Sequence, residues 1–120
     1  MAYLAFGFSA LVALLQAYFL VLEMFLWATP FGQKTFGRSK AQQEETKILA
    51  ANQGLYNGFL AAGLVWAFFL EPAQAFAVRV FFLACVLVAG LYGAATAARK
   101  ILFVQALPAA LALAFVLLSR

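Results

Sequence analysis

Four long apolar runs, separated by short polar segments, dominate the chain. The runs cover about residues 2–28, 46–70, 75–98 and 101–118. Each is close to the ~20 residues that a helix needs to cross the hydrocarbon core of a bilayer. The pattern therefore predicts an all-α fold. We expect an integral membrane bundle of four transmembrane helices, antiparallel and up-down, forming one domain over residues 1–120.

The segments between the runs carry the turn signals. Pro30 ends the first run and opens a long loop, Thr29–Gln43, in which a short amphipathic helix on the membrane surface is an option. Glu71–Gln74 predicts a tight turn, and Arg99–Lys100 predicts the last one. Pro108 is expected to kink the fourth helix, because proline removes one backbone hydrogen bond.

Composition narrows the class of protein. Hydrophobic residues make up 68% of the chain and charged residues 10%, which is more apolar surface than a soluble domain of this size can hide. The net charge of +4 comes from basic residues in the loops, so it does not indicate nucleic acid. With no histidine and a single cysteine, Cys85, the usual metal, haem and nucleophile arrangements are excluded, and no cofactor or metal is expected.

The second run contains an unusual set of polar residues for a membrane helix. On a helix, four polar side chains fall within an arc of about 140°, and they are Asn52, Gln53, Tyr56 and Asn57. The neighbouring arc is smooth and predicts close helix packing, through Gly54, Gly58 and Ala62. Amides in hydrocarbon need partners, so the polar arc indicates either a pocket or hydrogen bonds that join helices.

Glu23 lies one turn inside the end of the first run. A carboxyl group there is costly unless it is paired or hydrogen-bonded. Two interpretations remain open. The side chain either reaches the interface or pairs with a basic residue such as Lys47, or it lines a pocket as an acid or base, with Tyr56 as a second candidate catalytic residue.

Polar residues on all four runs share one depth. Tyr92 and Thr96 on the third run and Gln105 on the fourth lie at the level of Glu23 and the polar arc, whereas the opposite halves are almost wholly apolar. This one-sidedness predicts a polar pocket that opens towards the cytoplasm or the inner leaflet. Its expected ligand-binding residues are Asn52, Gln53, Asn57, Tyr92, Thr96 and Gln105.

Basic residues are distributed unequally between the two sides. With four spans, one side holds Lys34, Arg38, Lys40, Lys47, Arg99 and Lys100, and the other holds Arg79 and Arg120. Because basic loops stay in the cytoplasm, we expect a multi-pass protein of the bacterial inner membrane with both termini outside.

Three segments together resemble a known family. They are Leu22–Trp27, then Thr29-Pro30 with Gly32 and Phe36, then Ala51–Gly63. They resemble a bacterial family catalogued as domain of unknown function 1304, and the resemblance covers essentially the whole chain. It implies a small four-span inner-membrane protein. The family's Glu and its Asn-Gln-Gly-x-Tyr-Asn motif correspond to Glu23, Asn52, Gln53, Gly54, Tyr56 and Asn57. Some relatives carry an epoxidase label, which no cofactor motif in this sequence supports.

Three functions are compatible with these features. The first is a pocket for a small apolar ligand with one polar group, of the lipid, quinone, terpenoid or epoxide type, with proton-transfer chemistry as an option. The second is an accessory subunit of a larger membrane complex, and the third is proton-coupled export of small molecules. The expected partners are membrane lipids, a small apolar ligand, and either further copies of the chain or a larger membrane complex.

Overall fold

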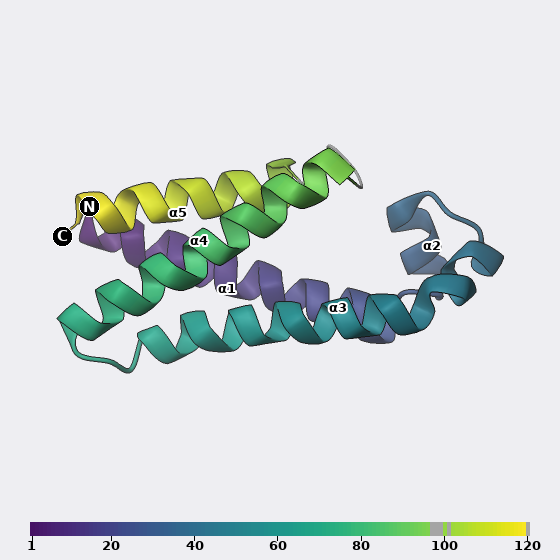
Figure 1. Cartoon of the computed structure of the whole chain (residues 1–120), viewed down its shortest axis with the longest axis horizontal. Helices are drawn as coiled ribbons and strands as arrows, with labels where there is room; N and C mark the ends of the chain where they lie inside the picture. The colour runs from purple at the N-terminus through teal and green to yellow at the C-terminus, as the bar shows by residue number, and fades with distance from the viewer. Residues whose placement is uncertain (97–99, 101, 120) are drawn as a thin grey trace. The chain divides into compact units, whose positions relative to one another are not determined.

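The computed structural model describes residues 1–96, 100 and 102–119, and all its regular elements are helical. In chain order they are α1 (Ala2–Phe25), α2 (Pro30–Phe36), α3 (Lys40–Ala67), α4 (Pro72–Thr96), the π-helix η1 (Leu102–Ala106) and α5 (Leu107–Leu118). Figure 1 traces them along the chain. Residues 97–99, 101 and 120 lie outside the described residues, and so does Arg99 of the predicted last turn.

The prediction of a long loop over Thr29–Gln43 is wrong in its extent, because α2 and the first residues of α3 occupy most of it. Thr29 caps α2 by accepting a hydrogen bond from the Gly32 amide, and Gly37 ends the helix with a left-handed φ of 62°. In α3, the Ser39 hydroxyl accepts from the Gln42 amide while the Gln42 side chain accepts from the Ser39 amide. This reciprocal capping box starts α3 at Lys40, earlier than the apolar run suggests.

The chain divides into two compact units, which we describe separately. The bundle unit comprises Met1–Leu15 and Leu60–Arg120. Its core is built from small and branched residues of α1, α3, α4 and α5, namely Ala5, Val12, Ala13, Leu64, Leu83, Val86, Ala109, Ala112 and Val116. Such small residues allow helix backbones to approach closely, as at Gly90, where an added Cβ atom would lie 2.7 Å from the backbone nitrogen of Ala106. The residues before Pro108 form η1, a π-helical turn that ends directly before Leu107, and the kink expected at Pro108 stays a prediction.

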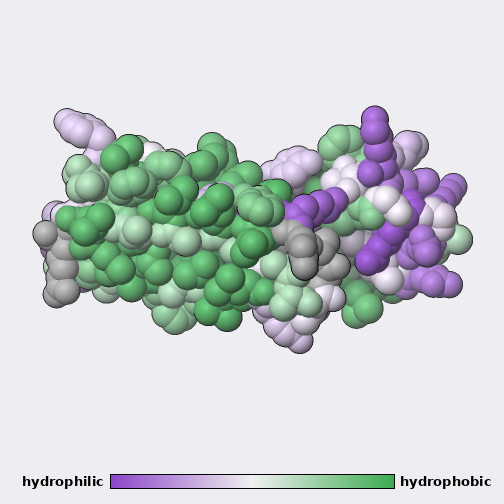
Figure 2. Space-filling view, turned by 90° about the horizontal axis from the view of Figure 1, so that it is seen from above, coloured by the Kyte–Doolittle hydropathy of each residue, from purple (hydrophilic) through white to green (hydrophobic). Residues whose placement is uncertain are grey.

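The hairpin unit, Gln16–Phe59, contains the second half of α1, all of α2 and the first part of α3. Its exposed charged residues are concentrated in α2 and the first turns of α3, where hydrophilic colours gather in Figure 2. Apolar colours cover most of the surface of the bundle unit in the same view.

Two helices are long and apolar enough to cross a membrane by length and composition, namely α1 with 24 residues and α4 with 25. These helices suggest a membrane location. α3 has 28 residues, but its charged first turns and its carboxamides make it less apolar. The fourth predicted span corresponds to a shorter apolar helix, Leu102–Leu118.

Candidate functional site

The hairpin unit brings a carboxyl group and an amide together across two helices. Glu23, near the end of α1, is only 8% exposed. Asn57 of α3 donates a hydrogen bond from its Nδ2 to the Oε1 of Glu23, at 2.5 Å. The sequence left open whether Glu23 pairs with a basic residue such as Lys47 or lines a pocket. In the structure its hydrogen-bond partner from α3 is Asn57.

Glycines make this approach of α1 and α3 possible. A Cβ atom placed on Gly54 would lie 2.9 Å from the Cγ of Met24, 3.0 Å from the Cβ of Glu23 and 3.2 Å from the backbone oxygen of Leu20. A Cβ on Gly58 would meet the side chain of Leu20. Gly54 and Gly58 thus lie on the packing face, whereas Ala62, the third member of the predicted stripe, is exposed.

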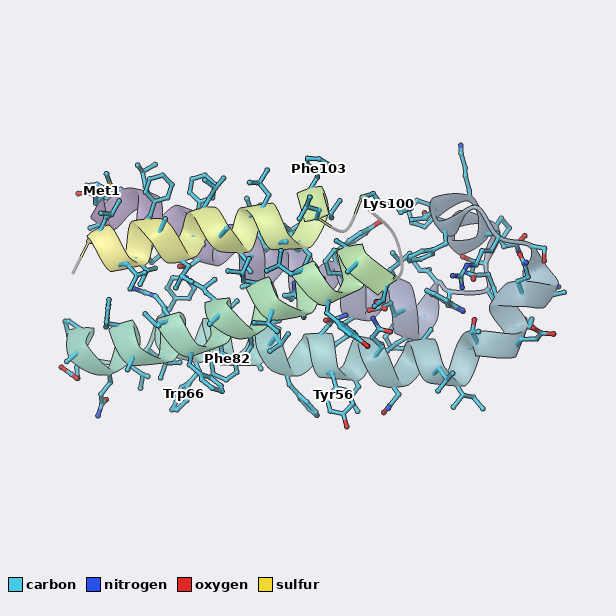
Figure 3. All side chains as sticks on the ribbon, turned by 45° about the horizontal axis from the view of Figure 1, so that its top comes forward. Met1, Tyr56, Trp66, Phe82, Lys100 and Phe103 are labelled. Atoms are coloured by element: carbon cyan, nitrogen blue, oxygen red, sulfur yellow. The ribbon has the colours of Figure 1, made fainter. Side chains whose placement is uncertain are left out.

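The other polar residues of the predicted arc face outward. Asn52, Gln53 and Tyr56 are exposed, and Figure 3 shows the Tyr56 side chain pointing outward from α3. The helical period explains the split. Asn57 lies about 60° from Gly54 around the helix axis, but Asn52 and Tyr56 lie about 160° from it. Of the arc, only Asn57 is therefore close enough to the buried face to reach α1.

The remaining predicted ligand-binding residues belong to the bundle unit. Tyr92 is 63% exposed. The hydroxyl of Thr96 donates to the backbone oxygen of Tyr92, one turn earlier in the same helix, at 2.7 Å. Gln105 is half-buried within η1. That these three residues share one pocket with the polar residues of the hairpin unit stays a prediction.

A second polar cluster, which the sequence did not predict, joins the turn between α1 and α2, α2 itself and the start of α3. Gln43 is fully buried, and its Nε2 donates to the backbone oxygen of Trp27 at 2.8 Å and to that of Gly32 at 3.5 Å. The indole Nε1 of Trp27 donates to the Thr46 hydroxyl at 3.0 Å, and its ring packs 4.6 Å from that of Phe36. The capping box at Ser39 was the available signal, because it places Gln43 inside the first turn of α3.

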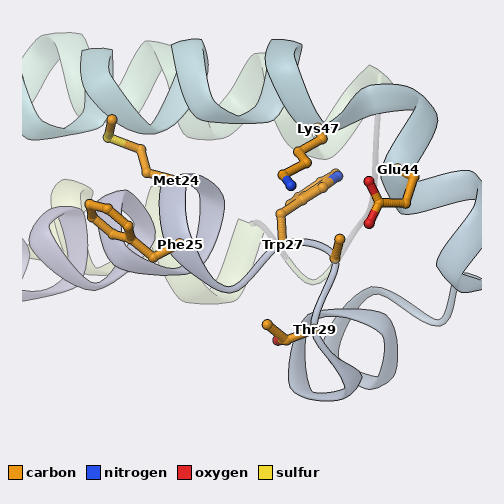
Figure 4. Close-up of a pocket in the computed structure, with 7 residues that line it drawn as sticks. Met24, Phe25, Trp27, Thr29, Glu44 and Lys47 are labelled. Carbon is orange, nitrogen blue, oxygen red and sulfur yellow. The ribbon is translucent and has the colours of Figure 1, made fainter.

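These contacts border a cavity of about 220 Å³ in the hairpin unit. Figure 4 shows the Lys47 side chain extending from α3 towards Trp27, with Glu44 nearby on α3. Apolar walls and polar groups are combined in its lining, which consists of Met24, Phe25, Trp27, Ala28, Thr29, Glu44 and Lys47. Among the residues that the structure describes, no three acidic or cysteine side chains form a group able to hold a metal ion.

The fold and the site define a class: an all-helical protein with two helices of membrane-spanning length and apolarity and a polar pair that links α1 to α3. Residues 10–117 match the family described as "Protein of unknown function (DUF1304)", and the chain belongs to this family. It is also similar to the "Uncharacterized protein YpaA" of Lactococcus lactis subsp. lactis (strain IL1403). The two are 38% identical over 107 residues, which cover 88% of this chain and 89% of that protein. No solved structure matches the chain.

Proposed function

We propose that the chain is a four-span inner-membrane protein whose hairpin unit binds a small apolar molecule with one polar group. The four-span topology is supported by the two long apolar helices, by the shorter apolar helix Leu102–Leu118 and by the 28 residues of α3. In this topology the basic residues of α2 and α3 face the cytoplasm, and both termini lie outside.

A C-terminal reporter tests this orientation. We expect alkaline phosphatase fused after Arg120 to be active, because this enzyme folds only outside the cytoplasm. A green fluorescent protein at the same position is expected to stay dark. Bright fluorescence together with an inactive phosphatase would reverse the proposed topology.

The observation that carries the binding proposal is the mixed lining of the cavity beside Trp27. Met24, Phe25 and Trp27 offer apolar contact, while Thr29 and Lys47 supply a hydroxyl and an ammonium group. Ligand sites typically combine apolar walls with a few polar groups that fix orientation. At about 220 Å³ the cavity suits a small molecule or one end of a longer one. Glu23 directly precedes Met24, which lines the cavity, and its pair with Asn57 would supply an acid or base for proton transfer.

Tryptophan fluorescence offers a direct binding assay, because the chain has only two tryptophans, Trp27 and Trp66. In a Trp66→Phe variant, Trp27 is the sole reporter and lines the cavity. We expect decylubiquinone or farnesol to change its emission in a saturable manner. The matched control is Trp27→Phe, in which Trp66 reports from the bundle unit and is expected to show no saturable change.

A cavity-filling substitution distinguishes binding at this site from partition into the detergent. Ala28 lines the cavity, and Ala28→Phe in the Trp66→Phe background should abolish the saturable change. A response that rises linearly with probe concentration, or that survives in the Ala28→Phe variant, would contradict the proposal.

Proton-coupled export is a second candidate, which the buried pair of Glu23 and Asn57 supports. A carboxyl group inside an apolar helix is a common feature of proton pathways. The test is proton uptake by liposomes that contain the purified protein and an entrapped pH dye, with an outward gradient of a lipophilic cation. Under this reading Glu23→Gln abolishes uptake, whereas equal uptake by both proteins excludes the carboxyl group as the proton carrier.

A further inference from the structure

The bundle unit contains a larger cavity of about 660 Å³ that the proposed function does not use. The start of α1, the turn after α3, the first turn of α4 and the end of α5 surround it, and Figure 1 shows these segments at the same end of this unit. Much of the lining is apolar, including Phe68, Leu70, Phe76 and Val116. Among the residues that the structure describes, Arg79 is the one cationic side chain in this lining.

Arg79 is half-buried and has an unsatisfied donor. Its guanidinium carbon lies 4.9 Å from the centre of the Phe68 ring, which holds the group in place. Its Nε is buried and has no hydrogen-bond partner among the residues that the structure describes. A buried donor without a partner is costly, so the position calls for an acceptor.

Within the described part of the chain, the groups around Arg79 leave the role of acceptor open. Glu71 is the only acidic residue in the sequence from 60 to 120, and its Oε1 accepts a hydrogen bond from the Gln74 amide, at 2.8 Å. The hydroxyl of Ser119, which also lines the cavity, donates to the backbone oxygen of Val116 at 2.9 Å. The first turn of α4 borders the cavity as well, and the N-terminal end of a helix favours negative charge.

We propose that this cavity binds the oxyanion head group of an amphiphile, with the adjoining part of its acyl chain against the aromatic wall. A planar guanidinium matches a carboxylate or phosphate with two parallel hydrogen bonds. The volume lies within the range of about 300–1,000 Å³ that is typical of ligand sites. The site is separate from the one proposed around Trp27 and does not depend on it.

Native mass spectrometry of the full chain in a mild detergent tests this assignment. The probes are oleate for a carboxylate head, phosphatidylglycerol for a phosphodiester head, monoolein as a neutral amphiphile and inorganic phosphate as a free anion. We expect saturable binding of oleate, phosphatidylglycerol or both, at least tenfold tighter than that of monoolein. Which of the two binds tighter identifies the head group.

Two variants locate the binding. Arg79→Gln removes the charge and is expected to weaken binding of the anionic amphiphile about tenfold or more, as expected for hydrogen bonds to a charged group. Arg79→Lys keeps the charge but lacks the planar guanidinium, so its affinity should lie between those of Arg79→Gln and the unaltered chain. It serves as the informative variant if Arg79→Gln does not fold. Arg38→Gln, a matched change on the exposed surface of the hairpin unit, should bind as the unaltered chain does.

Four results would overturn the proposal. They are equal binding of monoolein and oleate, binding of inorganic phosphate without binding of either anionic amphiphile, unchanged binding in both Arg79 variants, and no binding of any probe. The last result would leave a water molecule as the acceptor for Arg79.

Discussion

Replacing Gly54 by alanine tests the contact that brings α1 against α3 in the hairpin unit. The added methyl group would lie 2.9 Å from the Cγ of Met24 and 3.0 Å from the Cβ of Glu23. The side chain of Met24 can rotate away. The backbone oxygen of Leu20, at 3.2 Å, moves only if α1 itself moves.

Two opposing effects set the change in the free energy of unfolding that Gly54→Ala causes. Alanine is favoured over glycine inside a helix by roughly 0.5–1 kcal/mol. Overpacking of a close contact costs typically about 1–3 kcal/mol. The expected result is a net destabilisation of about 1 kcal/mol, which corresponds to a fall of about 4 °C in the melting temperature for a chain of this size.

Gly7 provides a matched control in α1, because a Cβ atom there would meet nothing within 4 Å. Gly7→Ala should therefore raise the melting temperature slightly, since only the helix preference remains. Both variants are to be compared with the unaltered chain in the same detergent, by circular dichroism at 222 nm during heating. A Gly54→Ala protein as stable as Gly7→Ala would refute the close contact between α1 and α3.

Three further predictions concern the same unit. Single and double replacements of Glu23 by Leu and Asn57 by Leu, each of which removes the hydrogen bond, should give a coupling energy of about 0.6–1.7 kcal/mol in a double-mutant cycle, as for hydrogen bonds between membrane helices, and additive effects would exclude the bond. Gln43→Ala should lower the free energy of unfolding by about 1–3 kcal/mol, because it leaves buried backbone oxygens without a donor, whereas exposed Gln53→Ala should have little effect. Gly37→Ala should cost about 1 kcal/mol, because its φ of 62° is unfavourable for alanine; an unchanged melting temperature would contradict that conformation.

Family membership and the all-helical fold follow from the sequence alone. Long apolar runs, proline and glycine at their ends and the motif around Asn52 are local features, and they predict helices without knowledge of what packs against them. The smooth face at Gly54 and Gly58 was also readable, because glycine spacing on a helix indicates where another backbone comes close.

Only the tertiary structure decided which polar residues are brought together. The helical period places Asn57 nearer to the Gly54 face than Asn52 or Tyr56, but only the structure shows that Glu23 of α1 lies opposite it. In an apolar chain, residues that face lipid and residues that face other helices have similar hydrophobicity, so the usual contrast between core and surface is lost. The burial of Gln43 could not be predicted from the sequence either. It depends on the carbonyl groups of Trp27 and Gly32, which become its partners only after α2 folds back against the start of α3.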